Sequence, residues 1–545
     1  MRQIKTWHVA SLLIALGIVA VALWFTRWRQ SAVMDTMGTP AARKFFEQGE
    51  HARFWGKGDW PLAAKDYRQA IDLDPNYVNA HEMFIQAMIV SHPKDFAAAT
   101  KNLKQLYEGW AREHPNRAVY VWALGILCGE DLAKAETYYR KALARDPSFA
   151  AADNSLAWIA ESRGDSALAR EYLKKAMEAN PREPKYLLDY AYSERRVNPT
   201  LYRQLSLEVV KRFPQNDTAA HALLWLAEYA PTPQERIADL ERLKNEFPPS
   251  RFIWSAMGME MLFYTYLQES PHKAWALAQQ MATSLPDPSD RDEFRAKSTF
   301  AGNLVKAESL MTRHDYGEAE ALLAATKAPG FAGYGTRYEV DRGKSLEGMG
   351  KTPQAYKYLL ALVAHEPNHR LEAALQETGS TFGKTPKDVE KDVWRKREET
   401  SQPAKAFTLT NYDDGKPVSL ASFRGQIVLL DFWFPACGPC RESFPYLQDV
   451  LEKYRGQKYV TLAINVVSEQ DQGVVPFLKQ NHYGFIPLKS NGQVEKDYGV
   501  RGEPTTFLID GRGRIIFRPH VYDPRTGEIL DLEVGELLAH ETKKG

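Results

Sequence analysis

Residues 427–445 read IVLLDFWFPACGPCRESFP, and this stretch decides the fold of the C-terminal part of the chain. Residues 427–432 are a short apolar run with the length and composition of a buried strand. Cys437 and Cys440 follow it, and apolar residues then continue at helical spacing from Leu447. The pattern therefore predicts that the two cysteines lie where a strand turns into a helix.

That placement favours redox chemistry. A helix N-terminus offers unpaired N–H groups and the positive end of the helix dipole, which stabilise a thiolate relative to a thiol. The thiolate is the species that attacks disulfides, and cysteines in C-x-x-C motifs have lowered pKa values. With two residues between them, the second thiol can release a mixed disulfide that the first has formed.

A C-x-x-C motif is also half of a zinc site. A structural zinc site needs four ligands, usually supplied as two pairs. The only other cysteine is Cys128, far away in the sequence and without a neighbouring cysteine. This ligand count favours a redox pair, and we predict no metal and no cofactor.

Two separated motifs resemble a known fold. Asp431-Phe432-Trp433 followed by CGPC resembles the active-site run of thioredoxin, and VRGEPTTFLID at 500–510 resembles its second signature, a cis-proline before an apolar strand. The segment from 403 to the end, with FTLTN and GKPVSLASFRGQ near its start, resembles the membrane-anchored TlpA/ResA-like thiol–disulfide oxidoreductases. The resemblance implies an α/β thioredoxin-like domain at 403–545.

The resemblance also implies roles for individual residues. Cys437 would be the exposed nucleophile and Cys440 the resolving thiol. Asp431 occupies the place of a buried acid, where a carboxylate with a raised pKa can take the proton of the resolving cysteine. Pro504, if cis, would present the backbone of Glu503 to the cysteines and bind the substrate backbone.

Further residues are expected to contact the substrate. They are Trp433, Gly438, Pro439, Glu503 and Thr505. The chain departs from the family at Ala436, where thioredoxin has a second tryptophan, and at Ser443, where ResA-like proteins often have glutamate. Glu503 is an alternative source of a carboxylate that modulates the thiols.

The start of the chain predicts a membrane anchor at 1–30. Residues 9–25 are a nearly unbroken apolar run of 17 residues, which is the short end for a spanning helix. A cleavable signal peptide is the competing interpretation, but the run ends in FTRWR rather than in a small-residue cleavage site. Flanking charges leave the orientation open. The resemblance implies an inner-membrane protein that contacts the membrane through residues 7–26, with its C-terminal domains on the periplasmic side.

A repeat follows a short polar tether. Prolines expected to end the second helix of each unit are Pro75, Pro115, Pro147, Pro181, Pro214 and Pro248. Their spacings are 40, 32, 34, 33 and 34 residues, close to the tetratricopeptide (TPR) period. Small and large residues recur in register as Ala63, Tyr67 and Ala70, then Ala135, Tyr139 and Ala142, then Ala169, Leu173 and Ala176.

This pattern predicts an all-α TPR-like solenoid at 41–375, looser after Pro181. Such a solenoid presents a concave surface to a protein partner. The alternative is a spacer or a brace for the redox domain. The net charge of +1 gives no indication of nucleic-acid binding.

Two further features resemble sites. HEPNH at 365–369 matches the zinc-protease pattern, but that chemistry needs one continuous helix and Pro367 breaks it. Cys128, in an apolar helical stretch, is expected to be a buried small hydrophobe.

Residues 376–402 are predicted to be a linker with one short helix, and the charge run at 395–399 is predicted to be a solvated face.

Within 403–545 we predict an open α/β sheet. The expected strands are 406–409, 427–432, 459–467, 485–488, 504–509 and 514–518, and the expected helices are 440–454, 474–480 and 532–539.

Three functions fit the sequence. The first is a reductase of disulfides in exported proteins, supplied with electrons by another thiol protein and acting in cell redox homeostasis and antioxidant defence. The second is an oxidase, isomerase or thiol peroxidase on the same fold. A peroxidase would want threonine three residues before its reactive cysteine, where this chain has Phe434. The third is an interaction protein whose redox domain is accessory.

Overall fold

The computed structural model describes residues 38–544 except 55–57, 93–94, 130, 328–335, 518 and 522–525. The anchor predicted at 1–30 lies outside these residues. In the part of the chain that is described, no helix combines the length and hydropathy that a membrane span requires. The chain divides into two compact units, one with residues 38–265 and 277–295 and the other with 266–276 and 296–544.

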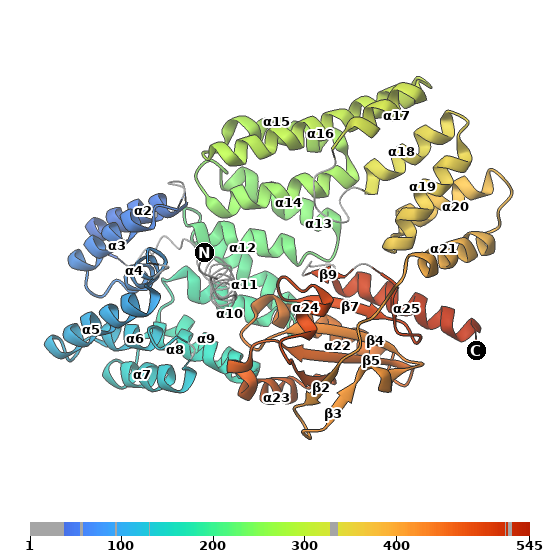
Figure 1. Ribbon diagram of the computed structural model, residues 1–545. Coiled ribbons are helices and arrows are strands. Elements are labelled where there is room, and N and C mark those ends of the chain that lie inside the picture. The colour runs from blue at the N-terminus through green and yellow to red at the C-terminus, as the bar shows by residue number, and fades with distance from the viewer. Residues whose placement is uncertain are drawn as a thin grey trace, which may run out of the picture. The chain divides into compact units, whose positions relative to one another are not determined.

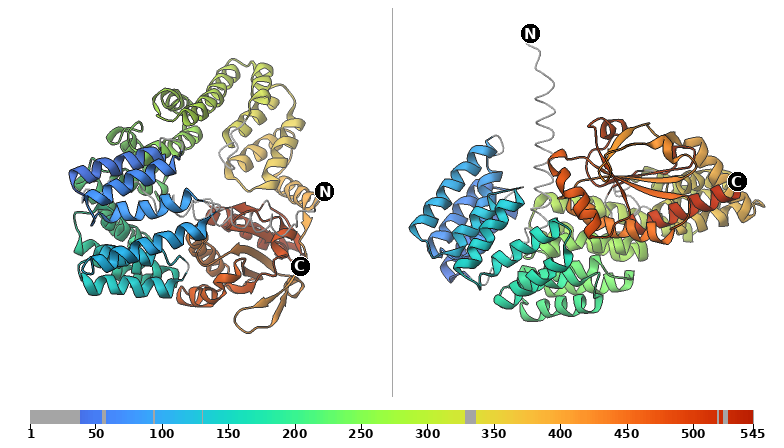
Figure 2. Two further views of the ribbon diagram at one scale, coloured as in Figure 1. Left: turned by 60° about the vertical axis from the view of Figure 1, so that its left-hand side comes forward. Right: turned by 90° about the horizontal axis from the view of Figure 1, so that it is seen from below.

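The first unit is a series of helical hairpins in which consecutive helices pack side by side (Figures 1 and 2). Six hairpins are made by α2 (Pro40–Phe54), α3 (Trp60–Leu73), α4 (Val78–Val90), α5 (Phe96–Glu113), α6 (Ala118–Ile126), α7 (Leu132–Arg145), α8 (Ala150–Ser162), α9 (Ser166–Ala179), α10 (Pro184–Glu194), α11 (Pro199–Arg212), α12 (Asp217–Glu228) and α13 (Pro233–Glu246). Each of the six repeat-ending prolines lies two residues beyond the second helix of its hairpin. The predicted period is therefore the period of the hairpins.

Aspartates begin the second helices of the best repeats. Asp59, Asp131 and Asp165 are the N-caps of α3, α7 and α9, and each side chain accepts a hydrogen bond from the backbone N–H three residues later, at 3.1, 3.0 and 2.9 Å. Such caps satisfy donors that have no partner within the helix. Gly58 and Gly164 precede two of them with φ of 74° and 86°, values that favour glycine.

The recurring alanines and tyrosines form the core of the hairpins, as predicted. Ala63 and Ala70 have no exposed surface, and neither does Tyr67 between them. Ala142 is likewise fully buried beside Tyr139, which is 4% exposed. Small residues let paired helices approach, and the large ring fills the space that remains.

The boundary between the units passes through three long helices, α14 (Ile253–Glu269), α15 (Pro271–Ser284) and α16 (Pro288–Thr312). The second unit continues with α17 (Tyr316–Ala325), α18 (Thr336–Gly348), α19 (Thr352–His365), α20 (His369–Ser380) and α21 (Pro386–Thr400). Because α19 ends at His365 and α20 begins at His369, the two histidines of HEPNH do not share a helix. The predicted break at Pro367 is confirmed.

The charged segment before the redox domain is not a solvated face throughout. Residues 395–399 belong to α21, and the side chain of Arg397 is only 1% exposed. Its guanidinium forms an ion pair with Glu536 at 2.6 Å and donates hydrogen bonds to the carbonyl oxygens of Val363 and Ala364. The prediction was wrong for Arg397 because its partners lie in helices distant in sequence.

The C-terminal part is a mixed sheet covered by helices (Figure 1). Its strands are β1 (Gln402–Pro403), β2 (Thr408–Asn411), β3 (Pro417–Ser419), β4 (Ile427–Trp433), β5 (Tyr459–Asn465), β6 (Ile486–Lys489), β7 (Thr505–Ile509), β8 (Arg514–Ile515) and β9 (His520–Val521). The order is β1-β8-β7-β4-β5-β6-β2-β3, with β9 also paired to β7. Strand β4 is central, parallel to β5 and antiparallel to β7.

Helices cover both faces of the sheet. Those after β4 are α22 (Gly438–Lys453), α23 (Asp471–Gln480), α24 (Val494–Tyr498) and α25 (Thr526–Lys544). Side chains from α22, α23 and α25 share one apolar cluster with the odd-numbered residues of β4, whereas α24 packs on the even-numbered residues. We call the first face the α22 face.

The predicted α/β architecture is confirmed, with differences in detail. Strands β1, β3 and β9 and helix α24 were not predicted, because each is too short to show a periodicity. Helix α25 begins at Thr526 rather than at 532, and β2 begins at Thr408 rather than at 406.

Candidate active site

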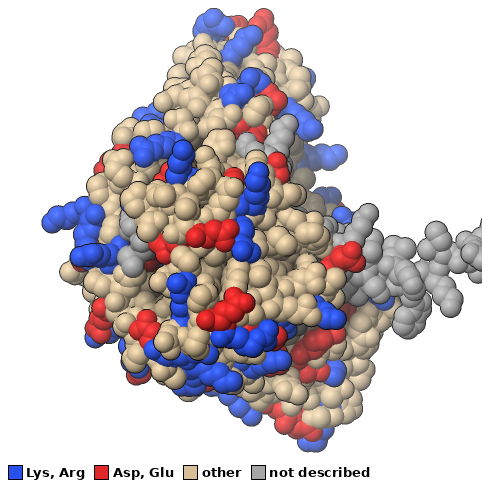
Figure 3. Space-filling view, turned by 90° about the vertical axis from the view of Figure 1, so that its left-hand side faces the viewer, with Lys and Arg blue, Asp and Glu red and all other residues tan. Residues whose placement is uncertain are grey.

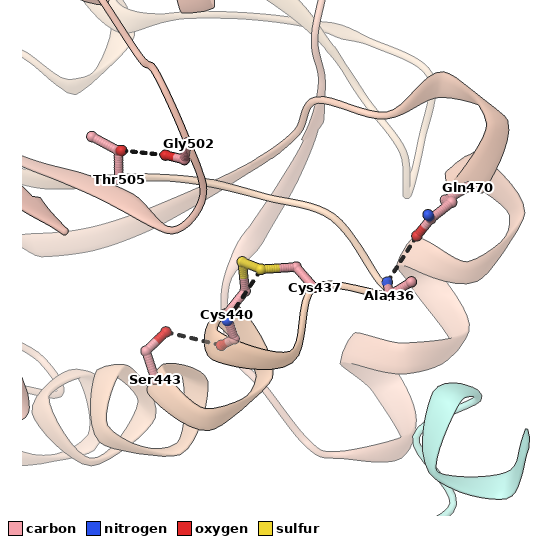
Figure 4. The surroundings of a disulfide bond; sticks show 7 residues. All are labelled: Ala436, Cys437, Cys440, Ser443, Gln470, Gly502 and Thr505. Carbon is pink, nitrogen blue, oxygen red and sulfur yellow. Dashed lines mark hydrogen bonds between the residues drawn. A yellow bond between two sulfur atoms is a disulfide. The ribbon is translucent and has the colours of Figure 1, made fainter. Parts of the chain in front are cut away.

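The two cysteines lie at the start of α22 and form a disulfide (Figure 4). Cys437 is the N-cap, and its Sγ accepts a hydrogen bond from the backbone N–H of Cys440 at 3.2 Å. Pro439, within the first turn, fits because a first-turn residue needs no N–H for the helix. A sulfur held at a helix N-terminus in this way is stabilised as a thiolate once the disulfide opens.

Neighbouring polar groups fix the loop before the helix (Figure 4). The backbone N–H of Ala436 donates to Oε1 of Gln470 at 2.8 Å, and the hydroxyl of Ser443 donates to the carbonyl oxygen of Cys440 at 2.9 Å. Ser443 therefore binds the backbone of the first turn of α22. No sequence motif pointed to Gln470, which lies 34 residues from its partner.

Both sulfurs are buried in this disulfide-bonded form. Cys437 is 1% exposed and Cys440 has no exposed surface. The expectation of an exposed Cys437 is not met here, because its Sγ is bonded to Cys440 and packs within the apolar cluster of the α22 face. The attack of Cys437 on a substrate thus requires the reduced form.

Asp431 is a buried acid in the middle of β4. It is 1% exposed, and neither carboxyl oxygen has a hydrogen-bond partner among the described residues. Burial raises its pKa well above the ordinary value, and the charge of Glu503 raises it further. Because an uncharged carboxyl is less costly to bury than a charged one, the protonated form is favoured at rest.

The predicted cis peptide is present between Glu503 and Pro504. The hydroxyl of Thr505 donates to the carbonyl oxygen of Gly502 at 2.6 Å, which ties the turn to the first residue of β7 (Figure 4). Glu503 is half-buried, and its pKa is raised by burial and then by the charge of Glu495.

Trp433 does not line the surface in this structure. It has no exposed area and packs against Phe444 and Phe477, with ring centroids 4.6 and 5.5 Å away. Its contribution is to the packing beneath the cysteine loop. Gly438 and Pro439 are also buried. In this disulfide-bonded form, a substrate therefore has no access to these three residues, which were expected to contact it.

The third cysteine belongs to the first unit. Cys128 is partly buried beside the apolar core of the first unit, and its thiol donates to the carbonyl oxygen of Leu124 at 3.3 Å. Burial raises its pKa, which disfavours the reactive thiolate. Among the described residues, no three histidine, cysteine or acidic side chains are grouped as metal ligands.

A polar pair that the sequence did not indicate lies on the α22 face. Nε2 of His520 in β9 is 2.8 Å from Oε2 of Glu533 in α25. The side chain of Glu533 has no exposed surface and that of His520 is 12% exposed. Only the packing of β9 against α25 brings them together, so no spacing rule could have found them.

Comparisons with known proteins agree with this geometry. Residues 399–534 match the Redoxin family model, and residues 129–184 match a tetratricopeptide repeat model. The chain is 34% identical over 119 residues to the thiol-disulfide oxidoreductase ResA of Bacillus thuringiensis, which covers 22% of this chain and 68% of the relative.

Two other proteins show the same likeness. The sporulation thiol-disulfide oxidoreductase A of Bacillus subtilis is 35% identical over 22% of this chain and 73% of its own length. A solved thiol:disulfide interchange protein of the thioredoxin family from Chlorobium tepidum is 26% identical over 25% of this chain and 97% of its own, with a TM-score of 0.23. Through its C-terminal domain, the chain belongs to the thioredoxin-fold thiol–disulfide oxidoreductases.

Proposed function

We propose that Cys437 and Cys440 are the redox-active dithiol of a ResA-like reductase that acts on disulfides of exported proteins. The observation that carries this proposal is the disulfide at the N-terminus of α22, whose N-cap sulfur accepts the N–H of Cys440. Opening that bond leaves a thiolate where the helix dipole and an N–H group stabilise it.

Each residue has a role in the exchange. The Cys437 thiolate attacks a substrate disulfide and forms a mixed disulfide, and one substrate sulfur leaves as a thiolate. Cys440 then loses its proton to Asp431 and attacks the sulfur of Cys437, which releases the second substrate sulfur. The backbone beside Pro504 binds the substrate chain, and Glu503 and Thr505 border it.

The rest of the chain determines where disulfide reduction takes place and which protein is brought to it. Residues 7–26 anchor the protein in the inner membrane, with the redox domain on the periplasmic side, where exported substrates and an electron-donating thiol protein meet it. The helical repeats recruit a protein partner. Basic and acidic side chains are interspersed on the face shown in Figure 3, and the net charge is +1, which favours a protein partner over nucleic acid.

The equilibrium reduction potential of the Cys437–Cys440 pair tests the direction of electron flow. The full chain is equilibrated in dithiothreitol buffers, and free thiols are alkylated and counted, with a Cys128→Ser variant to remove the third thiol. A reduction potential of about −270 mV, the range of thioredoxin, supports a reductase. A reduction potential of about −120 mV identifies instead an oxidant that introduces disulfides into its substrates.

Two further measurements test the remaining parts. The full chain should stay with membranes through an alkaline wash, and a chain without residues 1–30 should not. A Cys437→Ser variant should lose disulfide reduction and keep any partner bound by the repeats. Unchanged reduction by that variant would show that the chemistry lies elsewhere.

A further inference from the structure

Three side chains form a row across neighbouring strands beneath the cysteines. Asp431 of β4 is paired with Thr506 of β7, and Thr506 is paired in turn with His520 of β9. Both pairs are antiparallel, and residues directly opposite each other point to the same face, with Cβ atoms about 5 Å apart. The row therefore runs from the buried acid to the edge of the sheet.

The row lies on the face that carries the resolving cysteine. Ile427, Leu429 and Trp433 of β4 share the apolar cluster of Cys440, and Asp431 has the same parity along the strand. Leu508 of β7 belongs to that cluster too, and Thr506 is two residues away from it. His520 confirms the orientation, because it contacts Glu533 of α25, which covers this face.

Of the two residues paired with Asp431 across the described strands, only Thr506 is polar. Its neighbour on the other side, Ala463 of β5, is apolar and fully buried. Glu503 lies near enough to raise the pKa of Asp431, but a second acid opposes the loss of its proton. Thr506 offers a hydroxyl that can both accept and donate a proton.

The far end of the row is suited to receive a proton. His520 is 2.8 Å from Glu533, whose buried carboxylate stabilises a protonated imidazole, and Oε1 of Glu533 has no hydrogen-bond partner among the described residues. Burial raises the pKa of Glu533 and the facing His520 lowers it; of the more distant charges, Glu366 raises it and Arg397 lowers it. At 12% exposure, His520 reaches solvent, whereas Asp431 at 1% does not.

We propose that Thr506 and His520 carry protons between Asp431 and solvent, with Glu533 holding the imidazole in place. The inference rests on the proposed reductase function. Asp431 must lose its resting proton before it can accept the proton of Cys440. In the disulfide-bonded form neither carboxyl oxygen of Asp431 has a hydrogen-bond partner among the described residues, so the acid proton passes through water to the hydroxyl oxygen of Thr506. The proton of that hydroxyl passes through water to His520 and from there to solvent.

With this route the protons and electrons of the reaction balance. The Cys440 proton goes to Asp431, and the Cys440 thiolate attacks Cys437 while the Cys437–substrate bond breaks. Two electrons pass from the dithiol to the substrate disulfide. The resting proton of Asp431, which left through Thr506 and His520, ends on one of the two released substrate thiolates, and the Cys440 proton takes its place on Asp431. The products are the enzyme disulfide with Asp431 protonated again, one substrate thiol and one substrate thiolate.

The test separates formation of the mixed disulfide from its resolution. The reduced full chain is mixed with a disulfide-bonded peptide, quenched with acid at set times, and the free, mixed and resolved species are separated. Thr506→Val keeps the side-chain shape without the hydroxyl, and Thr506→Ser restores the hydroxyl. His520→Gln and His520→Ala remove the imidazole. His540→Gln is the control, since His540 in α25 is 16% exposed and lies 3.8 Å from Glu398.

We expect Thr506→Val and His520→Gln to slow resolution about tenfold near neutral pH, a fraction of the ~10²-fold effect of a full general base. Formation of the mixed disulfide should not change. Thr506→Ser and His540→Gln should match the parent. Added imidazole should restore resolution in His520→Ala but not in Thr506→Val, a rescue that a purely structural role would not give.

The outcomes are distinct. The route is overturned if both Thr506→Val and His520→Gln resolve the mixed disulfide as fast as the parent. It is also overturned if Glu503→Gln slows resolution while Thr506→Val does not. If the parent forms no mixed disulfide through Cys437, the proposed reductase function itself fails. If His520→Gln lowers stability, the Thr506→Val and Thr506→Ser pair still decides the result.

Discussion

The guanidinium of Arg397 lies 2.6 Å from the carboxylate of Glu536, and its side chain is only 1% exposed. The ion pair joins α21 to α25, the last helix of the sheet domain. The guanidinium also lies 4.8 Å from the ring centroids of Trp394 and Phe517. A segment that resembled a charged linker is therefore part of the packing of the redox domain.

Arg397→Ala should lower the local free energy of unfolding of α25 by about 1–3 kcal/mol, because it removes the ion-pair partner of the half-buried Glu536 and the donors to two backbone carbonyl oxygens. Hydrogen exchange of the backbone amides in α21 and α25 measures this change. The control is Arg395→Ala, two residues away, whose side chain is 61% exposed beside Asp392. It should cost less than about 1 kcal/mol. Equal effects of the two variants would contradict the role of Arg397.

The helical repeats allow a matched pair of glycine substitutions. A Cβ at Gly125 would come within 2.3 Å of the ring of Tyr139, whereas a Cβ at Gly109 in α5 would meet nothing within 4 Å. Gly125→Ala should destabilise the α6–α7 hairpin by about 1–3 kcal/mol through overpacking. Gly109→Ala should stabilise its helix by up to about 1 kcal/mol, since alanine is the better helix former. Hydrogen exchange of each helix tests both, and a stabilising Gly125→Ala would show that the hairpin packs differently.

The buried acid predicts a dependence of stability on pH. Because the folded-state pKa of Asp431 is raised, the folded protein binds more protons than the unfolded chain above about pH 4, so stability falls as pH rises toward the folded-state pKa. Asp431→Asn removes this loss. The free energy of unfolding of the variant should therefore exceed that of the parent by a margin that increases with pH. This margin should grow by up to about 1.4 kcal/mol for each pH unit and level off above the folded-state pKa of Asp431.

Urea unfolding at several pH values, followed by proteolysis with detection of peptides from β4 and β5, measures that margin for the redox domain. Glu503 also has a raised pKa, so Glu503→Gln is the comparison, with a smaller slope expected because Glu503 is only half-buried. A margin for Asp431→Asn that does not vary with pH would show that Asp431 is ionised in the folded protein.

The order of the two thiols is tested by trapping. Cys440→Ser lacks the thiol that resolves the mixed disulfide, so the adduct of Cys437 with substrate should accumulate to about one per chain. Cys437→Ser should give none. Cys128→Ser should behave as the parent, because that thiol is partly buried with a raised pKa. Mass spectrometry of the acid-quenched mixtures identifies the adducts, and an adduct on Cys440 in Cys437→Ser would reverse the assignment.

Periodic features of the sequence were predicted well. The proline period located six helical hairpins, and the apolar run before CGPC located β4 and the start of α22. These succeed because each depends on neighbouring residues alone: proline ends a helix, and a helix N-terminus follows a strand within a few residues. The same local logic correctly separated the two histidines of HEPNH.

Contacts between distant segments could not be predicted. Arg397 looks solvent-exposed beside its charged neighbours, and its burial depends on α19 and α25. Cys437 and Trp433 lie in the motif as expected, yet their burial depends on the disulfide and on the cluster around Phe444 and Phe477.

The sequence by itself determined the class of each part of the chain and the chemistry of the cysteine pair, because helical period, strand length and thiol spacing are local properties. Only the tertiary structure decided what surrounds the pair. Strand register places Thr506 between Asp431 and His520, and packing of α25 on the sheet brings Glu533 to His520. Register and helix packing depend on the whole fold, since a shift of one residue along a strand turns every side chain to the other face.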